Sequence, residues 1–123
     1  MRIKNIEIRG YAALAPMAGV ADRAMREVCR EYGAAFTVGE LTSARGITLN
    51  DKKSASLLSC AENERPFGSQ LFGNDPEIMA AAARLALKFN PDFIILIWAV
   101  PHLRLRVTAA EARLCVSLCL QKK

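Results

Sequence analysis

Histidine is nearly absent from this sequence, because the only one among its 123 residues is His102. Before that position no imidazole can act as a general base, a triad member or a metal ligand. The four cysteines, at positions 29, 60, 115 and 119, form no C-x-x-C pair. Without zinc-type ligand spacing the sequence predicts no metal site. It also shows no disulfide framework, which favours a reducing compartment.

Long hydrophobic runs are missing as well. The longest apolar stretch is Phe93–Val100, which is far too short to cross a bilayer. The first residues, Met1 to Lys4, are not followed by the apolar segment of a signal peptide. The sequence therefore predicts a cytoplasmic protein that does not bind a membrane.

The net charge of +5 is distributed unevenly. Residues 1–101 hold 12 Lys and Arg against 11 Asp and Glu, a net of +1. Residues 102–123 hold five basic residues against Glu111 alone, a net of +4. A basic net charge alone would favour nucleic-acid binding. Here most of the positive charge belongs to residues 102–123, so it does not indicate an RNA-binding surface.

Apolar runs alternate with helical patterns along residues 11–97. Strands are predicted near 11–16, 36–39, 67–72 and 93–97, and residues 1–10 fit a short hairpin strand that precedes them. Helices are predicted near 22–32, with Asp22 as N-cap and Gly33 as stop, and near 76–89, where Asp75-Pro76 is a strong start signal. This alternation favours an α/β fold with a parallel sheet.

Several short motifs in this part of the chain resemble the tRNA-dihydrouridine synthases, in particular the bacterial branch. The motif order and spacing suit that family over about three-quarters of the chain. L-A-P-M-A-G-V alone is moderately specific, since other flavin barrels begin similarly, and Q-L-F-G adds to it. The matching segments are Leu14–Val20, Asp22-Arg23, Asn50–Lys53, Leu57-Leu58, Glu64–Gly68, Gln70–Gly73 and Asp75-Pro76.

Beyond Ile94 the resemblance continues only in another reading frame. The Trp98 codon is TGG, and an ATA codon for Ile97 before it supplies the first base of ATG. We read this shifted frame in both directions, using only codons that the amino acids of this chain allow, and restored one G directly after the Ile94 codon. The reading is then D-F-I-D-I-N-M-G-C-P-A-P-K, which resembles the family's catalytic segment. We therefore expect two parts: residues 1–97, the N-terminal part of a flavin-binding (β/α)8 TIM barrel with about four βα units, and residues 98–123, an aberrant, out-of-frame tail.

The resemblance implies a cofactor site at the ends of the barrel strands, where the (β/α)8 fold places its active sites. It implies FMN as cofactor, with Pro16, Met17 and Ala18 near the flavin ring and Gln70 at its pyrimidine edge. A Gln inside an apolar strand needs partners, since a buried unpaired amide costs ~1–3 kcal/mol. Without the resemblance, Pro16 would only shape a turn and Gln70 would bond to loop backbone.

The family uses NADPH to reduce FMN, which passes hydride to a tRNA uridine while a cysteine protonates the uracil. The uridine must be presented out of the base stack. The restored frame places that cysteine at position 100 and an asparagine at position 97, where this chain has Val100 and Ile97. We assign no catalytic residue, since Cys115 and Cys119 belong to a fortuitous helix-like run. The chain is thus expected to be a truncated, inactive form that lacks the later phosphate-binding and tRNA-binding parts.

Two departures from the family pattern lie before Ile94. Ala21 stands in place of a usual threonine, and Gly39-Glu40-Leu41 in place of T-E-M; Glu40 is either a retained acid after the second strand or a solvated loop residue. Two alternatives stay open. One is a fragment that binds flavin or RNA without chemistry, and the other is a different flavin barrel, such as a dihydroorotate dehydrogenase relative. Oligomeric state is not indicated.

Overall fold

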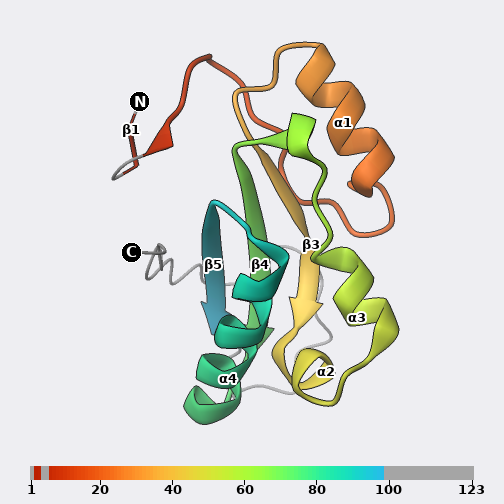
Figure 1. Cartoon of the computed structure of the whole chain (residues 1–123), viewed down its shortest axis with the longest axis vertical. Helices are drawn as coiled ribbons and strands as arrows, with labels where there is room; N and C mark the ends of the chain where they lie inside the picture. Colours follow the sequence, from red (N-terminus) through yellow and green to blue (C-terminus); the bar gives the residue numbers. More distant parts are fainter. Residues whose placement is uncertain (1, 4–5, 99–123) are drawn as a thin grey trace.

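The computed structural model describes residues 2–3 and 6–98. Its centre is a parallel sheet of three strands, β3 (Thr37–Ser43), β4 (Phe67–Gly73) and β5 (Phe93–Trp98), in the order β3-β4-β5. Figure 1 shows the three arrows side by side, all pointing the same way. Successive strands in sequence are therefore neighbours in space. This confirms the predicted mixed α/β class and parallel sheet.

The strand predicted near 11–16 is wrong as a strand. Only Leu14 forms an isolated parallel bridge, to Thr37 of β3. Two backbone hydrogen bonds, from Leu14 N–H to the Phe36 carbonyl and from Ala35 N–H to the Ala12 carbonyl, hold the segment beside β3. The turn of residues 17–20 follows after two residues, so the ladder has no length in which to extend. The segment still occupies the position of a fourth parallel neighbour, next to β3.

The two predicted helices are present. The first, α1 (Arg23–Glu31), begins at Asp22, whose side chain accepts from the Met25 N–H, and ends just before Gly33 at φ +92°. The second, α4 (Pro76–Ala86), begins at Asp75, which accepts from two backbone N–H groups. It continues as the short 3₁₀ helix η2 (Leu87–Phe89) and stops at Asn90 in the left-handed region. The sequence placed both starts correctly because an acidic N-cap is a local signal.

Three short elements were not predicted. Helix α2 (Ala44–Thr48) is capped by Ser43 and helix α3 (Lys52–Leu57) by Asp51. The 3₁₀ helix η1 (Glu62–Glu64) precedes β4. Each is only a few residues long, so helical periodicity could not reveal it. The hairpin expected at the start of the chain is confirmed as β1 (Arg2–Ile3) paired antiparallel with β2 (Ile6–Glu7).

The main core lies between the sheet and helices α2 and α4, which sit near the carboxyl ends of the strands in Figure 1. Leu71 and Ile94 contribute the sheet side of this core, and Leu96 and Trp98 pack against it. The helix side is mostly alanine, which lets α2 and α4 approach closely. Side chains alternate across a strand, so the residues between these, including Gln70, point to the opposite face. The buried cluster comprises Ala44, Ile47, Leu58, Leu71, Met79, Ala82, Ala83, Ala86 and Ile94.

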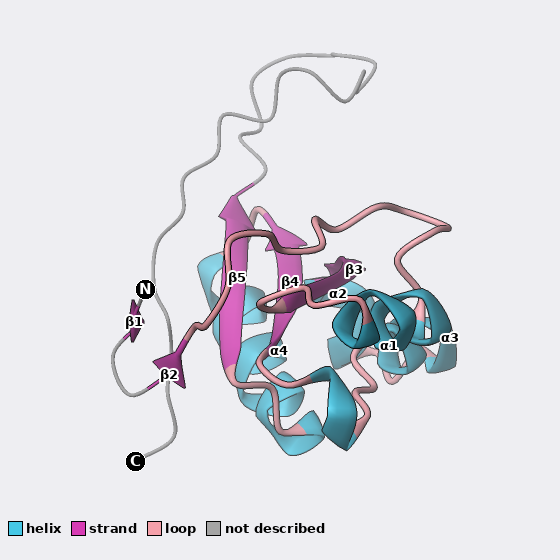
Figure 2. Cartoon of the chain, turned by 90° about the horizontal axis from the view of Figure 1, so that it is seen from above, coloured by secondary structure: helices cyan, strands magenta, loops and turns pink. Residues whose placement is uncertain are grey.

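The opposite face carries no helix among the described residues. In Figure 2 the helices lie to one side of the strands, and the loop that follows β2 passes on the other. Leu41, on this face, is 44% exposed, and Ile95 and Ile97 are only partly buried. Other side chains of the same face are covered by described residues, since Gln70 and Phe93 are 8% and 4% exposed.

Candidate functional site

Three polar features lie in the loop and the strands that lead to the carboxyl edge of the sheet: a turn, a carboxylate and an amide. The turn is the loop of residues 16–21, between the Leu14 bridge and α1. The carboxylate is Glu40 in β3 and the amide is Gln70 in β4. They are linked through the sheet, since Gly19 is bonded to Glu40 and the next residue, Leu41, pairs with Gln70. In open α/β sheets and barrels this edge is where ligands bind.

The loop of residues 16–21 folds back on itself. The backbone N–H groups of Val20 and Ala21 both donate to the Met17 carbonyl, at 3.1 and 2.8 Å. Gly19 lies at φ +72°, a left-handed conformation that favours glycine. Met17 is 39% exposed and Val20 is 51% exposed. The turn therefore holds apolar side chains in solvent beside the sheet edge, an arrangement suited to an apolar ligand surface.

Gln70 is an unusual residue in the middle of β4. Its flanking partners in the sheet are Leu41 and Ile95, and only 8% of it is exposed. Among the described residues no hydrogen-bond partner for its side-chain amide is found. The fully buried side-chain atoms that lack a partner in the described residues are Arg30 Nε and Ser69 Oγ, so the Gln70 amide keeps some access to solvent. Gln70 therefore offers one acceptor and two N–H donors to a ligand on the open face of the sheet.

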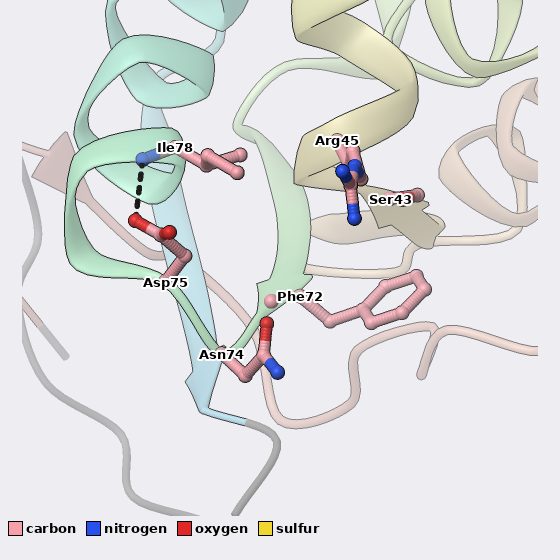
Figure 3. A pocket seen from close by; sticks show the side chains of 7 residues that line it. Ser43, Arg45, Phe72, Asn74, Asp75 and Ile78 are labelled. Atoms are coloured by element: carbon pink, nitrogen blue, oxygen red, sulfur yellow. Dashed lines mark hydrogen bonds between the residues drawn. The ribbon is translucent and has the colours of Figure 1, made fainter. Parts of the chain in front are cut away.

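A cavity of about 390 Å³ adjoins this edge at the ends of β3 and β4. Figure 3 shows the Arg45 guanidinium, the Phe72 ring and the Asn74 amide around it. Asp75 faces the α4 start, where its Oδ1 accepts from the Ile78 N–H at 3.2 Å. A cation, an amide and an aromatic ring together can bind a phosphate and a flat ring. The lining residues are Ser43, Arg45, Phe72, Gly73, Asn74, Asp75 and Ile78.

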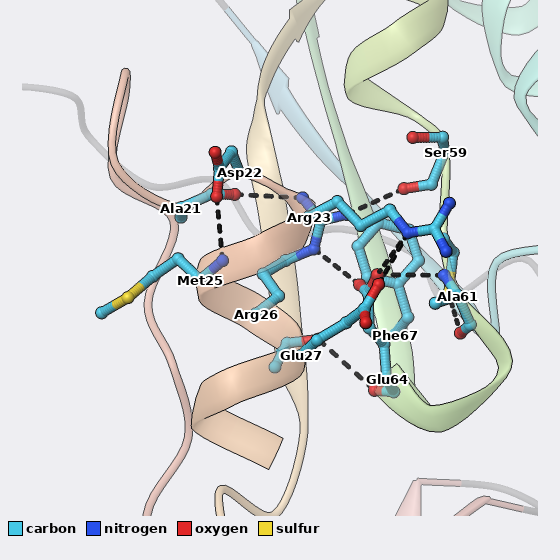
Figure 4. A network of polar contacts seen from close by, with 12 residues as sticks. Ala21, Asp22, Arg23, Met25, Arg26, Glu27, Ser59, Ala61, Glu64 and Phe67 are labelled. Atoms are coloured by element: carbon cyan, nitrogen blue, oxygen red, sulfur yellow. Dashed lines mark hydrogen bonds and ion pairs between the residues drawn. The ribbon is translucent and has the colours of Figure 1, made fainter. Parts of the chain in front are cut away.

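Behind the loop lies a buried ion pair between Arg26 of α1 and Glu64 of η1. Arg26 Nε lies 2.7 Å from Glu64 Oε2, and their side chains are 3% and 0% exposed. The remaining guanidinium nitrogens donate to the carbonyls of Ala21 and Ser59, at 3.0 and 2.8 Å. Glu64 Oε1 accepts from the Ala61 N–H at 2.9 Å. Figure 4 shows this network joining α1, the end of the loop and η1.

The ring of Phe67 completes the network from the sheet. The Arg26 guanidinium carbon lies 4.8 Å from the Phe67 ring centroid, a cation–π contact. Next to it, Arg65 pairs with Asp92 at 2.9 Å and donates to the Asn90 carbonyl. The segment Glu64–Gly68 is therefore a structural motif that joins α1 to the start of β4 and β5, rather than a set of ligand contacts.

Cysteine chemistry is weak in the described part of the chain. Burial, reinforced by the nearby Glu64 carboxylate, raises the pKa of the Cys60 thiol to about 11. At neutral pH this thiol stays protonated and is a poor nucleophile. Cys29 is also a free thiol and is partly buried. Within the described residues no group of three or more His, Cys, Asp or Glu side chains could hold a metal ion.

Comparison with known proteins identifies the family. A model of the family described as dihydrouridine synthase (Dus) matches residues 13–95. The chain belongs to the dihydrouridine synthase family. The match spans the loop, Glu40 and Gln70, so the candidate site lies within the family domain. It confirms the resemblance drawn from residues 14–76 and decides against the dihydroorotate dehydrogenase relatives.

Curated relatives of this family are similar over the same region. The tRNA-dihydrouridine synthase B of Vibrio parahaemolyticus is 37% identical over 95 residues, 76% of this chain and 29% of the relative. A probable tRNA-dihydrouridine synthase of Aquifex aeolicus is 41% identical over 87 residues, 70% of this chain and 27% of the relative. That of Treponema pallidum is 30% identical over 113 residues, 91% of this chain and 33% of the relative. The chain thus spans about three-tenths of these relatives' length.

The structure places the four predicted cofactor residues in two segments. Pro16, Met17 and Ala18 lie in the loop, and Gln70 lies two strands away across β3. Val100, the position expected to carry the dihydrouridine synthase cysteine, lies outside the described residues, as do Cys115 and Cys119. Within the described residues no helix is long and apolar enough to span a membrane.

Sequence reasoning left the role of Glu40 open. The structure places Glu40 inside β3, not after it, and bonds it to the loop. The register between β3 and β4 shifts between Val38 and Leu41, and this irregularity was invisible in the sequence. Gly39 was the available signal, because glycine inside a strand often marks a bulge.

Proposed function

We propose that this chain is the first part of the FMN-binding (β/α)8 barrel of a tRNA-dihydrouridine synthase, with about four βα units. The observation that carries this proposal is Gln70: a polar side chain, 8% exposed and with no hydrogen-bond partner among the described residues, on the sheet face that carries no helix in the described part of the chain. Three parallel strands in sequential order, with helices on one face, are the architecture that such a barrel repeats.

The residues present fit the ring end of a flavin. The isoalloxazine pyrimidine edge carries both donors and acceptors, which the Gln70 amide would satisfy. The exposed turn at Pro16, Met17 and Ala18 offers backbone groups and apolar contact at the same edge. When bound, FMN would supply the hydride-transfer chemistry that links NADPH to a uracil. The chain's own part would be to orient the ring and shield one side of it from water.

Substitution of Gln70 by methionine separates a ligand role from a structural role. If the amide awaits a flavin, Gln70→Met removes an unpartnered polar group, and the free energy of unfolding should stay equal or rise by up to about 1 kcal/mol. Binding of FMN and of lumiflavin, which lacks the ribityl phosphate, should weaken together, because both rings use Gln70. Fluorescence titration of the flavin measures this, and unchanged affinity for both flavins would refute the assignment.

A second proposal concerns the RNA. The names of the relatives specify tRNA, and the cavity beside Arg45 has the chemistry to hold a nucleotide of such a substrate. Arg45 would pair with a phosphate and Phe72 would stack against a base. Arg45→Ala should weaken binding of unmodified tRNA in a gel-shift assay, whereas Arg84→Ala, an exposed arginine on α4, should not. Equal losses would indicate nonspecific charge instead.

We further propose that the chain does not reduce uridines. Val100 has no proton to donate, and a missing general acid alone typically lowers the rate ~10²–10⁴-fold. We place the chain in the cytoplasm. There it would retain flavin or RNA binding at most. Stable retention of FMN during gel filtration is not expected, since only the ring end is contacted. A non-catalytic flavin- or RNA-binding fragment is therefore the second candidate function.

We propose that a frameshift after Ile94 separates residues 1–97 from an aberrant segment, 98–123. In support, the family model ends at residue 95. The Treponema match reaches further, at 30% identity. Sequencing of the coding DNA tests the proposal. Inserting one base after the Ile94 codon should regenerate D-I-N-M-G-C-P, and codons at Leu96 or Arg106 that cannot encode this motif would refute it.

A further inference from the structure

The register shift in β3 has a specific effect on Glu40. Between Val38 and Leu41 the strand contains one residue more than its partner β4. A Cβ at Gly39 would lie 3.0 Å from the Phe67 ring and 3.3 Å from the Leu57 carbonyl oxygen, so a larger residue there requires its neighbours to move. The hydroxyl of Thr42 donates to the Glu40 carbonyl at 3.1 Å. The bulge is therefore held from both sides, and extra residues of this kind redirect side chains.

The redirected carboxylate contacts the loop of residues 16–21. The Gly19 N–H donates to Glu40 Oε2 at 2.8 Å, across 21 positions of sequence. Within the described part of the chain no Lys or Arg lies within ion-pair distance of Glu40. Its one hydrogen bond to the loop is thus not in competition with a salt bridge, and a charged acceptor strengthens that bond.

The loop is held at its other end by Arg26. Arg26 donates to the Ala21 carbonyl, and its guanidinium is fixed by Glu64 and by the Phe67 ring. Phe67 is the same ring that a Cβ at position 39 would meet at 3.0 Å. The two attachments of the loop, at Gly19 and at Ala21, therefore share one support in β4.

We propose that Glu40 is a positioning residue: its carboxylate fixes the turn at Pro16–Gly19 in the conformation that receives the ligand. This rests on the proposed function for the ligand's identity, because the turn is the segment assigned to the flavin ring. The positioning itself is independent of that identity. Glu40 acts through the Gly19 amide and does not contact the reacting atoms.

Amide hydrogen exchange of the 123-residue chain tests the proposal. The variants are Glu40→Ala, Glu40→Gln, and Glu31→Ala, which removes the same charge from an exposed position on α1. Exchange at Gly19 should become about tenfold faster in Glu40→Ala, since a charged hydrogen bond is lost. Glu40→Gln keeps an acceptor oxygen and should stay within a few-fold of the original, and Glu31→Ala should be unchanged. The amides of β4 should retain their protection in every variant.

A flavin titration on the same proteins distinguishes this proposal from the proposed function. If Glu40→Ala weakens lumiflavin binding several-fold and Glu40→Gln restores it, both stand. If no variant, nor the original chain, binds flavin while Gly19 exchange follows the expected order, positioning stands and the flavin assignment fails. Equal Gly19 exchange in the original and Glu40→Ala chains overturns the proposal. Loss of protection throughout β4 also overturns it, because Glu40 would then act on the whole fold.

Discussion

The buried pair Arg26–Glu64 predicts an unusually large effect of single substitutions. With side chains 3% and 0% exposed, neither group can be rescued by water when its partner is removed. Removing one member of a buried pair costs about 3–5 kcal/mol. Glu64→Gln keeps an oxygen for the Ala61 N–H but leaves the Arg26 charge without a counterion. Arg26→Met also removes the hydrogen bonds to the Ala21 and Ser59 carbonyls, so it should lower the free energy of unfolding more than Glu64→Gln does.

Urea unfolding measures the effect. With a slope of roughly 1–3 kcal/mol/M, a loss of about 3 kcal/mol lowers the urea midpoint by roughly 1–3 M. The double variant Arg26→Met/Glu64→Gln should lose less than the sum of the single losses, because neither buried charge remains. The matched control is Glu27→Gln, which breaks the solvent-exposed pair with Arg23 at 2.7 Å and should leave the urea midpoint almost unchanged.

Two outcomes would refute this reasoning. If Glu64→Gln lowers the midpoint no more than Glu27→Gln does, the pair is hydrated in solution and does not join α1 to η1. If the single losses simply add in the double variant, the two residues act independently. In either case the loop at Ala21 would need another support.

Three further predictions concern single positions. Because burial raises the pKa of Cys60 to about 11, its alkylation at pH 8 should be at least about tenfold slower than that of Cys29, as measured by peptide mass spectrometry. The contribution of the protonated Cys60 thiol to stability is complete below the ordinary thiol pKa and is lost as pH rises through 11. Hydrogen bonds from the Ser54 hydroxyl and then its N–H lower the pKa of Asp51, so the difference in Tm between the original chain and Asp51→Asn should be present at pH 6 and shrink as pH falls below the ordinary carboxyl pKa. Gly19→Ala should destabilise the chain by about 1 kcal/mol in urea unfolding, because Gly19 has a positive φ; no change would show that the turn is not fixed.

The sequence predicted those features that local signals specify. Asp22 and Asp75 marked helix starts that the structure confirms, and Gly33 marked the end of the first helix through left-handed backbone. The three sheet strands were found because each is a short apolar run flanked by polar or turn residues. The end of β3 was predicted four residues too early, because the acidic Glu40 was expected to follow the strand.

Features that depend on distant partners were not predictable. The Arg26–Glu64 pair joins residues 38 positions apart, and nothing in either local sequence indicates that both are buried. Glu40 was left between two roles because its partner, the Gly19 N–H, belongs to the backbone and has no sequence signature. Gln70 was selected through the family resemblance, together with the cost of a lone amide inside an apolar strand, and its role as a cofactor contact stays a prediction.

Dihydrouridine formation on unmodified tRNA tests the central claim most directly. The 123-residue chain and a version with one base restored after the Ile94 codon would be assayed together with NADPH and FMN. We expect product from the frame-restored protein and none above background from the chain with Val100. Product from the short chain would contradict the account, because the reacting proton would then come from another group or from a partner chain. Activity in neither protein would count against the proposed reaction itself.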